Sequence, residues 1–553
     1  TTALVTGVLT TTAATVHTGG ITMPDNAKAI FGAGSDLQIY HDGSHSYIAE
    51  GGSATGSLRI RGQNLLLEDN SGKDYLNAVV DAQVELFHNG NKKLATTATG
   101  IDVTGTAVTD GLTVAGNVSV DGGTIKLDGN YPVGSNNVAL GDGALDASLT
   151  GASNTAIGSY SLTNNTSGAS NTGLGFAALG DTTTGSFNTA LGTSALENNT
   201  TASYNTAVGY QAAYTNTTGT ENVALGVFSL YANTTGIRNT ALGKSAMEVN
   251  TTGTDNVAVG VTALDANTTG ANNTALGNFS LTNNTTASNN TAVGYQAGKA
   301  VTTGASNTLI GSLAGDALTD GNQNVAVGYH SLSAEIRGDK NIAIGAGALQ
   351  VQSNSTDVDA FNVAVGHAAG AGVTTGINNT LIGGLAGDAL TVGSVNIAIG
   401  KQALTGDTKG SNSVAIGFQA LEAQNFTTAT DAYNVAVGSK AGESVTTGVS
   451  NTLIGGLAGD AFTDADYNVA IGHQALSADT LGSNSVAIGD AALRAQNFTT
   501  ATNAYNVAVG ASAGINVTTG VNNTLIGGLA GDSITTGGSN VALGTSALQA
   551  NTT

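Results

Sequence analysis

The sequence predicts an all-β protein whose larger part is a parallel β-solenoid, a coil of short strands in which each turn stacks on the previous one. Three observations lead to this prediction. One motif returns every 17 residues through about three-quarters of the 553 residues, and glycine occupies its fifth position in every copy. Short aliphatic runs separated by Gly, Asn and Thr are typical of brief strands with corners and disfavour helices. Such periodicity is the signature of repeat architectures.

The N-terminal part of the chain predicts β-structure of a different kind. We expect a β connector over residues 1–30 and β-hairpins over residues 31–100, where segments 39–43 and 86–90 each place Asp-Gly or Asn-Gly after an alternating apolar run. Such a pair is the strongest short-range signal for a hairpin. Residues 101–136 keep the alternation with frequent glycine, which predicts a slender β-stalk between two wider parts.

Residues 137–553 contain 24 consecutive repeats, which we expect to be 24 turns of the solenoid. The first position is Asn in 22 repeats and Ser in two (Ser413 and Ser485), the fourth is always Leu, Ile or Val, and the eighth is Ala in 20 and Ser in 4. From residue 307 onward every fourth repeat carries four extra residues, which gives a super-repeat of 72. Representative first and fifth positions are Asn137 and Gly141, Asn239 and Gly243, Asn379 and Gly383, and Asn451 and Gly455.

Stacking gives each fixed position a physical reason. Equivalent residues of successive turns lie about 4.8 Å apart, the spacing of neighbouring strands. The fourth position then forms a continuous aliphatic ladder, and the eighth forms a column that admits only a small side chain. The fifth-position Gly supplies a corner with positive φ or a close approach of two backbones. The first-position Asn forms a ladder of side-chain amides, as stacked Asn does in cross-β assemblies.

We expect the solenoid to associate with further copies of itself. Ordering 17 residues costs roughly 25 kcal/mol of conformational entropy. An aliphatic side chain at the fourth position, a frequent Leu at the ninth and two alanines bury too little apolar surface to offset that cost, and stacking hydrogen bonds supply only part of the difference. The simplest arrangement that buries more surface is a homotrimer around a fibre axis.

The sequence NSVAIG at residues 412–417 and 484–489 resembles the head repeat of YadA-type trimeric autotransporter adhesins. The resemblance covers residues 137–553 and implies a left-handed parallel β-roll within a homotrimer. The turn of this chain is longer than the usual turn of that family. The function that this resemblance implies is that of a bacterial cell-surface adhesin or extracellular filament protein.

The N-terminal part resembles tail fibres of marine tailed phages, including cyanophages. The segments that carry this resemblance are FGAGSDLQIYHDG at residues 31–43, KLATTATGIDVTG at residues 93–105, and residues 111–129. It implies a homotrimeric virion fibre, attached to tail or baseplate proteins at its N-terminal end and reaching toward the host with the other. The implied function is host attachment by multivalent adhesion to a surface glycan or protein receptor, with an extracellular location on the virion.

Two sets of side chains are candidate metal ligands. His41 and His45 flank the first hairpin turn, and a trimer would bring three copies together around an axis. No third ligand is evident beside them, which favours exposed turn histidines. A Ca²⁺ site would use carboxylates and turn carbonyls, and one Asp recurs within Leu-Ala-Gly-Asp in each super-repeat, but the nonapeptide of calcium-binding β-rolls is absent. These aspartates, for which a solvated corner is favoured, are Asp316, Asp388, Asp460 and Asp532.

Aromatic residues are candidate glycan contacts. Several turns end on Tyr or Phe directly before the first position of the next turn. If exposed, such rings could stack on sugars, since amphipathic rings favour interfaces. The alternative, which we favour, is that they pack against the next turn. The residues concerned are Phe187, Tyr204, Tyr433, Tyr467 and Tyr505.

Charge and motif content argue against other classes of protein. A net charge of −22 argues against nucleic acid as a partner, because its binders need basic patches. We find no run of about 18 apolar residues, so we expect no membrane insertion. The acids are scattered, and no Ser/His/Asp set, carboxylate pair or phosphate-binding loop stands out. We therefore expect neither enzymatic activity nor a bound cofactor.

Overall fold

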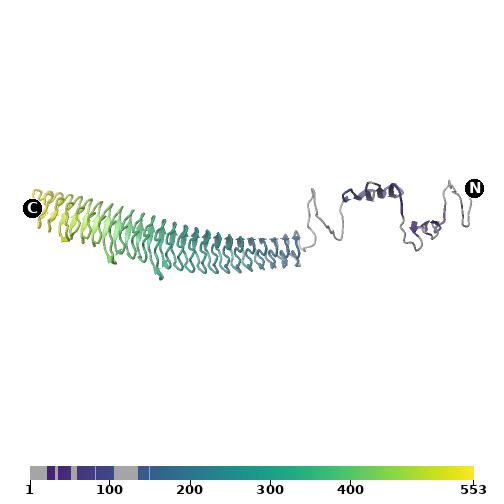
Figure 1. The fold of residues 1–553 in the computed structure, drawn as a ribbon, viewed down its shortest axis with the longest axis horizontal. Helices are drawn as coiled ribbons and strands as arrows, with labels where there is room; N and C mark the ends of the chain where they lie inside the picture. The colour runs from purple at the N-terminus through teal and green to yellow at the C-terminus, as the bar shows by residue number, and fades with distance from the viewer. Residues whose placement is uncertain are drawn as a thin grey trace, which may run out of the picture. The chain divides into compact units, whose positions relative to one another are not determined.

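The computed structural model describes residues 22–31, 35, 37–50, 59–80, 82–104, 135–147 and 150–552. Internal contacts divide the chain into two units, residues 1–124 and 125–553. Within the described ranges the secondary structure consists of strands and turns without a helix (Figure 1). Most of the predicted connector and of the predicted stalk lies outside these ranges, so both stay predictions.

Two antiparallel sheets make up the described part of the N-terminal unit. The first has the order β1-β2-β3 and the second the order β4-β5-β6-β7-β8, so each strand pairs with its neighbours along the chain. The strands are β1 (Lys28–Phe31), β2 (Leu37–His41), β3 (Ser46–Glu50), β4 (Asn64–Glu68), β5 (Asp74–Val79), β6 (Val84–His88), β7 (Asn91–Thr96) and β8 (Ile101–Val103).

Both predicted hairpins are confirmed. Between β2 and β3 the Asp42 carboxylate accepts hydrogen bonds from the backbone N–H groups of Ser44 and His45, at 2.9 and 2.8 Å, which closes the turn. Between β6 and β7, Asn89 and Gly90 have positive φ values of 53° and 74°. These values belong to the two-residue turn that favours Asn-Gly.

The N-terminal sheets lack a core of their own. Of the residues described in this unit, Ala95 alone is buried. A single sheet needs a second layer to cover its apolar face. The large side chains left exposed include Ile30, Phe31, Ile39, Ile48, Leu66, Leu67, Leu86 and Ile101.

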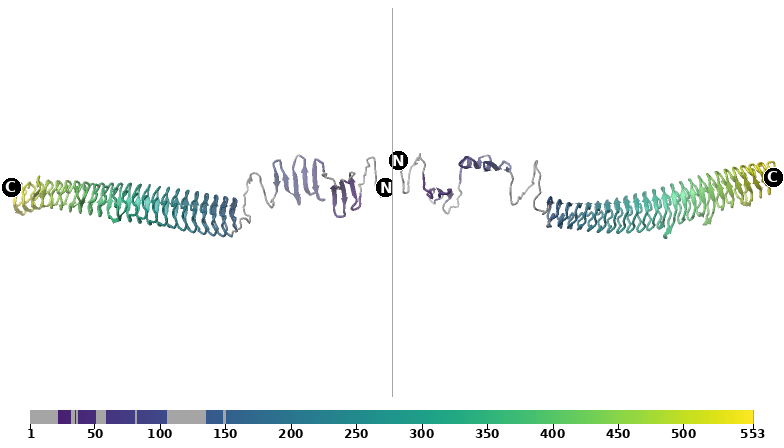
Figure 2. Two further views of the ribbon diagram at one scale, coloured as in Figure 1. Left: turned by 60° about the horizontal axis from the view of Figure 1, so that its bottom comes forward. Right: turned by 180° about the vertical axis from the view of Figure 1, so that it is seen from behind.

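The second unit is the predicted parallel solenoid, with one three-residue strand in each of 24 turns. Neighbouring strands pair in parallel, as Thr155 does with Thr172. Figures 1 and 2 show β9 and β38 at opposite ends of the stack, so the sheet is an open ribbon. The strands are β9 (Val138–Leu140), β10 (Thr155–Ile157), β11 (Thr172–Leu174), β12 (Thr189–Leu191), β13 (Thr206–Val208), β14 (Val223–Leu225), β15 (Thr240–Leu242), β16 (Val257–Val259), β17 (Thr274–Leu276), β18 (Thr291–Val293), β19 (Thr308–Ile310), β20 (Val325–Val327), β22 (Ile342–Ile344), β24 (Val363–Val365), β25 (Thr380–Ile382), β26 (Ile397–Ile399), β28 (Val414–Ile416), β30 (Val435–Val437), β31 (Thr452–Ile454), β32 (Val469–Ile471), β34 (Val486–Ile488), β36 (Val507–Val509), β37 (Thr524–Ile526) and β38 (Val541–Leu543).

The four extra residues of each longer turn form a loop that projects from the solenoid (Figures 1 and 2). The returning arm of each loop pairs in parallel with a short strand of the preceding turn. These pairs are β21 (Gly338–Asp339) with β23 (Val358–Asp359), β27 (Gly410–Ser411) with β29 (Thr430–Asp431), and β33 (Gly482–Ser483) with β35 (Thr502–Asn503). We call the longer turns, residues 341–361, 413–433 and 485–505, the display turns.

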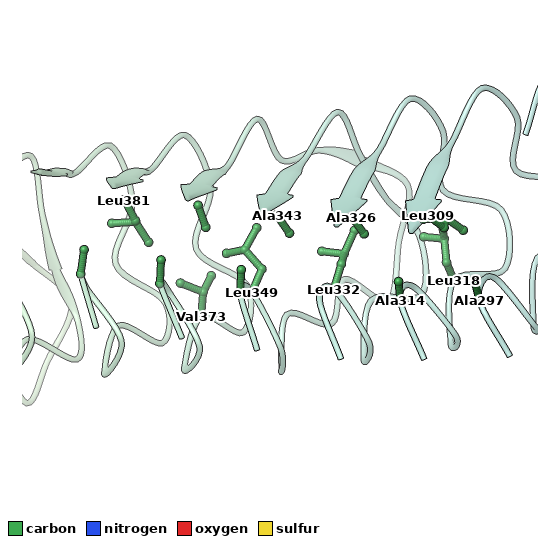
Figure 3. Packing of buried hydrophobic residues seen from close by; sticks show 14 of the residues in the cluster. Ala297, Leu309, Ala314, Leu318, Ala326, Leu332, Ala343, Leu349, Val373 and Leu381 are labelled. Carbon is green, nitrogen blue, oxygen red and sulfur yellow. The ribbon is translucent and has the colours of Figure 1, made fainter. Parts of the chain in front are cut away.

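The core of the solenoid is a narrow column filled from the third, eighth and ninth positions. In one turn these are Ala190, Ala195 and Leu196, all 0% exposed. The small residue predicted at the eighth position is thus confirmed as a core residue. Figure 3 shows the column in the middle of the solenoid, with Ala326 facing Leu332 and Ala343 facing Leu349.

Two kinds of turn fill this column differently. Where the ninth position is Leu, the third is Ala, except for Gly173 in one turn, and the twelfth is polar. Other turns have Gly at the ninth position, and an apolar residue at the twelfth, such as Val301 or Leu318, fills the space. In some of these turns Leu309 or its equivalent also enters from the third position (Figure 3). A Cβ atom on Gly298 would lie 2.6 Å from Leu309 Cδ1, so the two positions depend on each other.

The aliphatic ladder at the fourth position forms, but outside the core. Leu140, Leu225 and Leu276 are 50%, 46% and 37% exposed. Side chains alternate across a strand, so once the third position points inward, the second and fourth must point outward. The expectation that the fourth position helps to fill the core of its own turn is therefore wrong. Its side chains form an apolar stripe along the outer face of the sheet.

The predicted Gly corner is confirmed. Gly141, Gly243 and Gly383 each have a φ of 137°, and Gly455 has 138°. A Cβ on Gly141 would lie 2.6 Å from the carbonyl carbon of Gly158 in the next turn, so positive φ and close backbone approach occur together.

The Asn side chains link successive turns through the backbone. The Asn column forms, but bonds between side chains and backbone hold it in every turn, and amide-to-amide bonds such as Asn188 Nδ2 to Asn171 Oδ1 at 3.1 Å occur only in some. The N–H groups of Asn239, Asn379 and Asn451 donate to Oδ1 of the preceding turn's Asn, each at 2.9 Å. At the start of the column, Asn137 Oδ1 accepts from the N–H of Asn154 at 2.7 Å.

Candidate functional site

Fully buried acids lie beneath the display turns. The turn that precedes each display turn has an acid at its twelfth position, where most turns have Asn or an apolar residue. These acids are Glu335, Asp407 and Asp479, and each is 0% exposed. A buried charge needs hydrogen-bond partners to be tolerated, so the surroundings of each acid indicate its role.

The Asp479 carboxylate accepts hydrogen bonds from both turns that it touches. Its Oδ1 accepts from the backbone N–H groups of Gly482 and Phe498, each at 3.0 Å. Its Oδ2 accepts from Gln496 Nε2 at 2.6 Å. Gly482 belongs to the turn of Asp479, whereas Phe498 and Gln496 belong to the display turn. The carboxylate therefore fixes the base of the loop to the preceding turn.

The glutamine extends this network and explains the two exceptions in the Asn column. Gln496 Nε2 also donates to Ser485 Oγ at 3.1 Å, and its Oε1 accepts from Asn506 Nδ2 at 2.8 Å. Asp407, Gln424, Ser413 and Asn434 repeat the arrangement one super-repeat earlier. At both exceptions to Asn, the Ser hydroxyl accepts a hydrogen bond from the glutamine amide.

The first display turn is connected differently. Glu335 Oε1 accepts from the N–H groups of Gly338 and Asn354, at 2.8 and 3.0 Å, and Oε2 accepts from Asn354 Nδ2 at 2.9 Å. Gln352 donates nothing to this acid, and its Nε2 is buried without a partner. The first position of this turn has kept Asn341, consistent with the absence of the Asp–Gln–Ser network.

The network fixes the base of each of the two later loops, whose tips project from the solenoid. Phe426 and Phe498 are buried under the loops, at 5% and 6% exposed. The loop tips expose short side chains: Thr427, Thr428 and Ala429 in one, and Thr499, Thr500 and Ala501 in the next. The buried acids are not among the residues predicted from the sequence. Their signal was the joint appearance of an acid and a Gln, one turn apart, at the twelfth position.

The aromatic candidates lie on the surface. Tyr204, Tyr433 and Tyr505 are 60%, 57% and 55% exposed. Tyr204 stacks on Phe187 of the turn before, with ring centroids 5.1 Å apart and planes 4° apart. Tyr433 and Tyr505 end the second and third display turns, next to the loops. They are thus placed where a surface ligand can reach them.

The structure separates the four recurring aspartates. Asp316, Asp388, Asp460 and Asp532 are four turns apart, roughly 19 Å at strand spacing, so one chain cannot bring two of them to one ion. Oδ1 is buried without a partner in three of them, whereas Asp388 Oδ1 accepts from the Thr405 hydroxyl. Burial raises the pKa of the Asp316 and Asp460 carboxyls.

His41 and His45 lie at the predicted hairpin turn and are exposed. His41 Nδ1 is 3.2 Å from Ser46 Oγ, and His45 Nδ1 is 3.9 Å from Asp42 Oδ1. Within the described ranges, no three His, Asp or Glu side chains gather closely enough to hold a metal ion.

Comparisons with family models, curated proteins and solved structures give no match. In the part of the chain that the structure describes, no helix is long and apolar enough to cross a membrane. The strand order and the recurring loops define the class of protein as a β-solenoid with periodic surface loops.

Proposed function

We propose that this protein is a virion fibre, the tail fibre of a phage, which attaches the particle to its host by multivalent adhesion. The observation that carries the proposal is the uninterrupted parallel sheet of 24 strands, which makes a long, stiff shaft. At about 4.8 Å per turn, the shaft extends roughly 115 Å. Its fixed loops recur once in every super-repeat and suit repeated weak contacts better than a single deep binding site.

The proposal includes a homotrimer of left-handed rolls. Two observations support self-association: the apolar stripe at the fourth position of the sheet, and the N-terminal sheets, in which only Ala95 is buried among the described residues. Contiguous exposed apolar surface of this length marks an interaction surface. Three chains around one axis bury these surfaces and triple the number of loops, which raises the effective concentration of weak sites.

The partners in this proposal are tail or baseplate proteins at the N-terminal end and a host surface glycan or protein along the solenoid. The candidate contact residues are the loop tips together with Tyr433 and Tyr505. The alternative is a bacterial cell-surface trimeric adhesin or extracellular filament protein, which the Asn-Ser-Val-Ala-Ile-Gly repeats favour.

Two measurements test the proposal. Immunogold electron microscopy of the source particle, with antibodies against residues 137–553, should label fibres that leave the tail. Purified chain should also compete with the particle for adsorption to its host. Label on a cell envelope without particles would favour the adhesin, and a monomeric mass in light scattering would contradict the trimer.

A further inference from the structure

Apart from the display turns, the first turns of the solenoid carry a hollow lined by aromatic rings and carboxylates. Its volume is about 230 Å³, and its lining includes Tyr160, Phe176, Asp181 and Glu197. The two rings are 46% and 52% exposed. Their centroids are 5.8 Å apart and their planes meet at 85°, so they form two nearly perpendicular walls.

The hollow exists because one side chain is missing. Gly180 lines it and occupies the tenth position of its turn, where none of the other 23 turns has glycine. The neighbouring turns place Thr163 and Glu197 in the same column. The φ of Gly180 lies outside the left-handed region, and a Cβ there would be 3.3 Å from Ala177 O and 3.6 Å from Glu197 Cγ. The backbone therefore does not require glycine here.

The hollow carries uncompensated negative charge. Asp181 accepts a hydrogen bond from Asn164 Nδ2 at 3.0 Å. The ion pairs of the described residues leave both Asp181 and Glu197 without a cation. The charge of Glu197 is the main cause that raises the pKa of Tyr214, so it also acts on the aromatic surface beside the hollow.

A second aromatic pair in the same chain differs in the residue at the tenth position. Phe279 and Tyr295 occupy the positions of Tyr160 and Phe176, with centroids 6.0 Å apart and planes at 89°. There the tenth position, equivalent to Gly180, is Lys299, and Asp316 takes the place of Glu197. Burial raises the pKa of Asp316, and the charge of Lys299 acts in the opposite direction. The second pair thus has an ammonium group of its own beside its acid.

We propose that the hollow between Tyr160 and Phe176 binds an organic ammonium group carried by a host-surface molecule. A cation near an aromatic face is attracted by the ring quadrupole, and Asp181 and Glu197 supply the opposite charge. The bound ammonium would supply beside these acids the positive charge that Lys299 supplies beside Asp316. Two sources offer this group: an amino sugar of a glycan, and a quaternary headgroup such as choline. The inference deepens the proposed adhesive function and rests on it for where the ligand is met.

The test is equilibrium dialysis of the full chain with labelled choline and with a tetrasaccharide of glucosamine. We expect saturable binding of one equivalent per chain. The uncharged analogues, 3,3-dimethylbutan-1-ol and the fully N-acetylated tetrasaccharide, should compete at least about tenfold more weakly, because they lack the charge. Preference for choline identifies a headgroup as the source, and preference for the tetrasaccharide identifies a glycan. Equal competition by the uncharged analogues, or no binding of either cation, would overturn the proposal.

Three variants locate the site. Gly180→Lys should abolish binding, because Gly180 lines the hollow and a lysine there would occupy its space and neutralise its carboxylates. Glu197→Gln should weaken binding, whereas Glu248→Gln, the same change at another tenth position, should leave it unchanged. Lys299→Gly should add a second, weaker equivalent. Circular dichroism confirms that each variant is folded, and unchanged binding by folded Gly180→Lys would sink the assignment. If the chain binds choline but does not compete for adsorption, the adhesive function fails and the site stands.

Discussion

A typical turn of the solenoid holds four residues in the left-handed region, and only the first of them is always glycine. In one turn these are Gly243, with a φ of 137°, and Ser245, Met247 and Asp255, with φ of 55°, 51° and 59°. A non-glycine residue there costs on the order of 1 kcal/mol or more. An isolated turn would relax, so neighbouring turns must impose this conformation. The fifth position differs because a Cβ atom there would collide with the next backbone.

Substitutions at two adjacent glycines test the requirement for glycine at the fifth position. Gly383→Ala should destabilise the solenoid locally by at least about 1–3 kcal/mol, because a positive φ and a backbone contact both oppose the new methyl group. Gly384→Ala should be close to neutral, since a Cβ there meets nothing within 4 Å. Hydrogen exchange around residues 366–400 measures the difference. Equal protection in the two variants would contradict the role given to the fifth position.

A half-buried carboxyl with one oxygen lacking a partner gives a pH dependence with a definite sign. Burial, and secondarily the charge of Glu248, raises the pKa of Asp265 to about 6, and its Oδ1 has no hydrogen-bond partner. The folded state therefore holds this proton more tightly than the unfolded state, whose pKa is near 3.8. The stability that protonation provides is complete below pH 3.8 and is lost as the pH rises to about 6.

Asp265→Asn should remove this loss. The variant and the parent should differ least in stability below pH 4, and the variant should become the more stable of the two as the pH approaches 7. Denaturant unfolding of both chains across this range is the measurement. A difference that does not change with pH would show that the carboxyl is solvated.

At the scale of the turn, much of the architecture could be predicted from the sequence. The repeat, the strand at positions two to four, the Gly corner and the Asn column all follow from residues that recur in one environment. The sequence does not show which face of the strand points into the core, because both faces are apolar: Ala156 lies on one face and Ile157 on the other. The narrow core column determines which face points inward. Leu162 enters the column from the opposite wall and leaves room only for a small residue such as Ala156.

The two ways of filling the core predict a rescue. Gly387→Leu alone should destabilise its turn by about 1–3 kcal/mol through overpacking, because a Cβ there would lie 2.8 Å from Leu381 Cδ2. Adding Leu381→Ala restores the third and ninth positions of the other turns but keeps Leu390 at the twelfth, so we expect it to recover only part of the loss. Local hydrogen exchange of both variants tests this. A double variant less stable than the single one would show that the third and ninth positions do not share the same space in the core.

The Asp–Gln–Ser network predicts a local effect with an internal control. Asp479→Ala leaves buried donors of Gly482, Phe498 and Gln496 without an acceptor, at a cost of about 1–3 kcal/mol each. We expect the loop at residues 497–503 to lose protection from exchange, while the equivalent loop above Asp407 keeps it. If both loops respond alike, the carboxylate stabilises the shaft generally and does not fix one loop.

Over the whole solenoid, an outward stripe of Leu, Ile and Val runs along the sheet beside the second position, which is Thr in some turns and Val or Ile in the others. The Asn ladder and the buried acids lie inside the coil, so the stripe contains little that favours contact with water. The sequence could indicate that the chain needs to bury apolar surface beyond what a single solenoid covers. It could not indicate which face carried the excess, because that depends on the direction in which the third position points.

Charges on this stripe should prevent self-association without unfolding the chain. We expect four Glu substitutions at the fourth position to reduce the mass in light scattering to that of a monomer, with unchanged circular dichroism. Four Glu substitutions at exposed Thr residues of another face are the control and should leave the mass unchanged. The first set is Leu174, Leu225, Leu276 and Ile310, and the second is Thr184, Thr235, Thr252 and Thr269. Retained association of the first set would place the interface elsewhere.

Contacts between neighbouring turns of different sequence determine how many turns can be added or removed together. Leu381 reaches the space beside Gly370 of the turn before, and Asp407 bonds Gln424 of the turn after. Removing one turn would leave a void or a stranded carboxylate. Removing residues 413–484 would bring Asp407 beside Gln496 and restore every contact at the junction. From residue 307 onward, gene duplication or deletion can therefore change the length of the shaft without loss of contacts only by whole super-repeats of 72 residues.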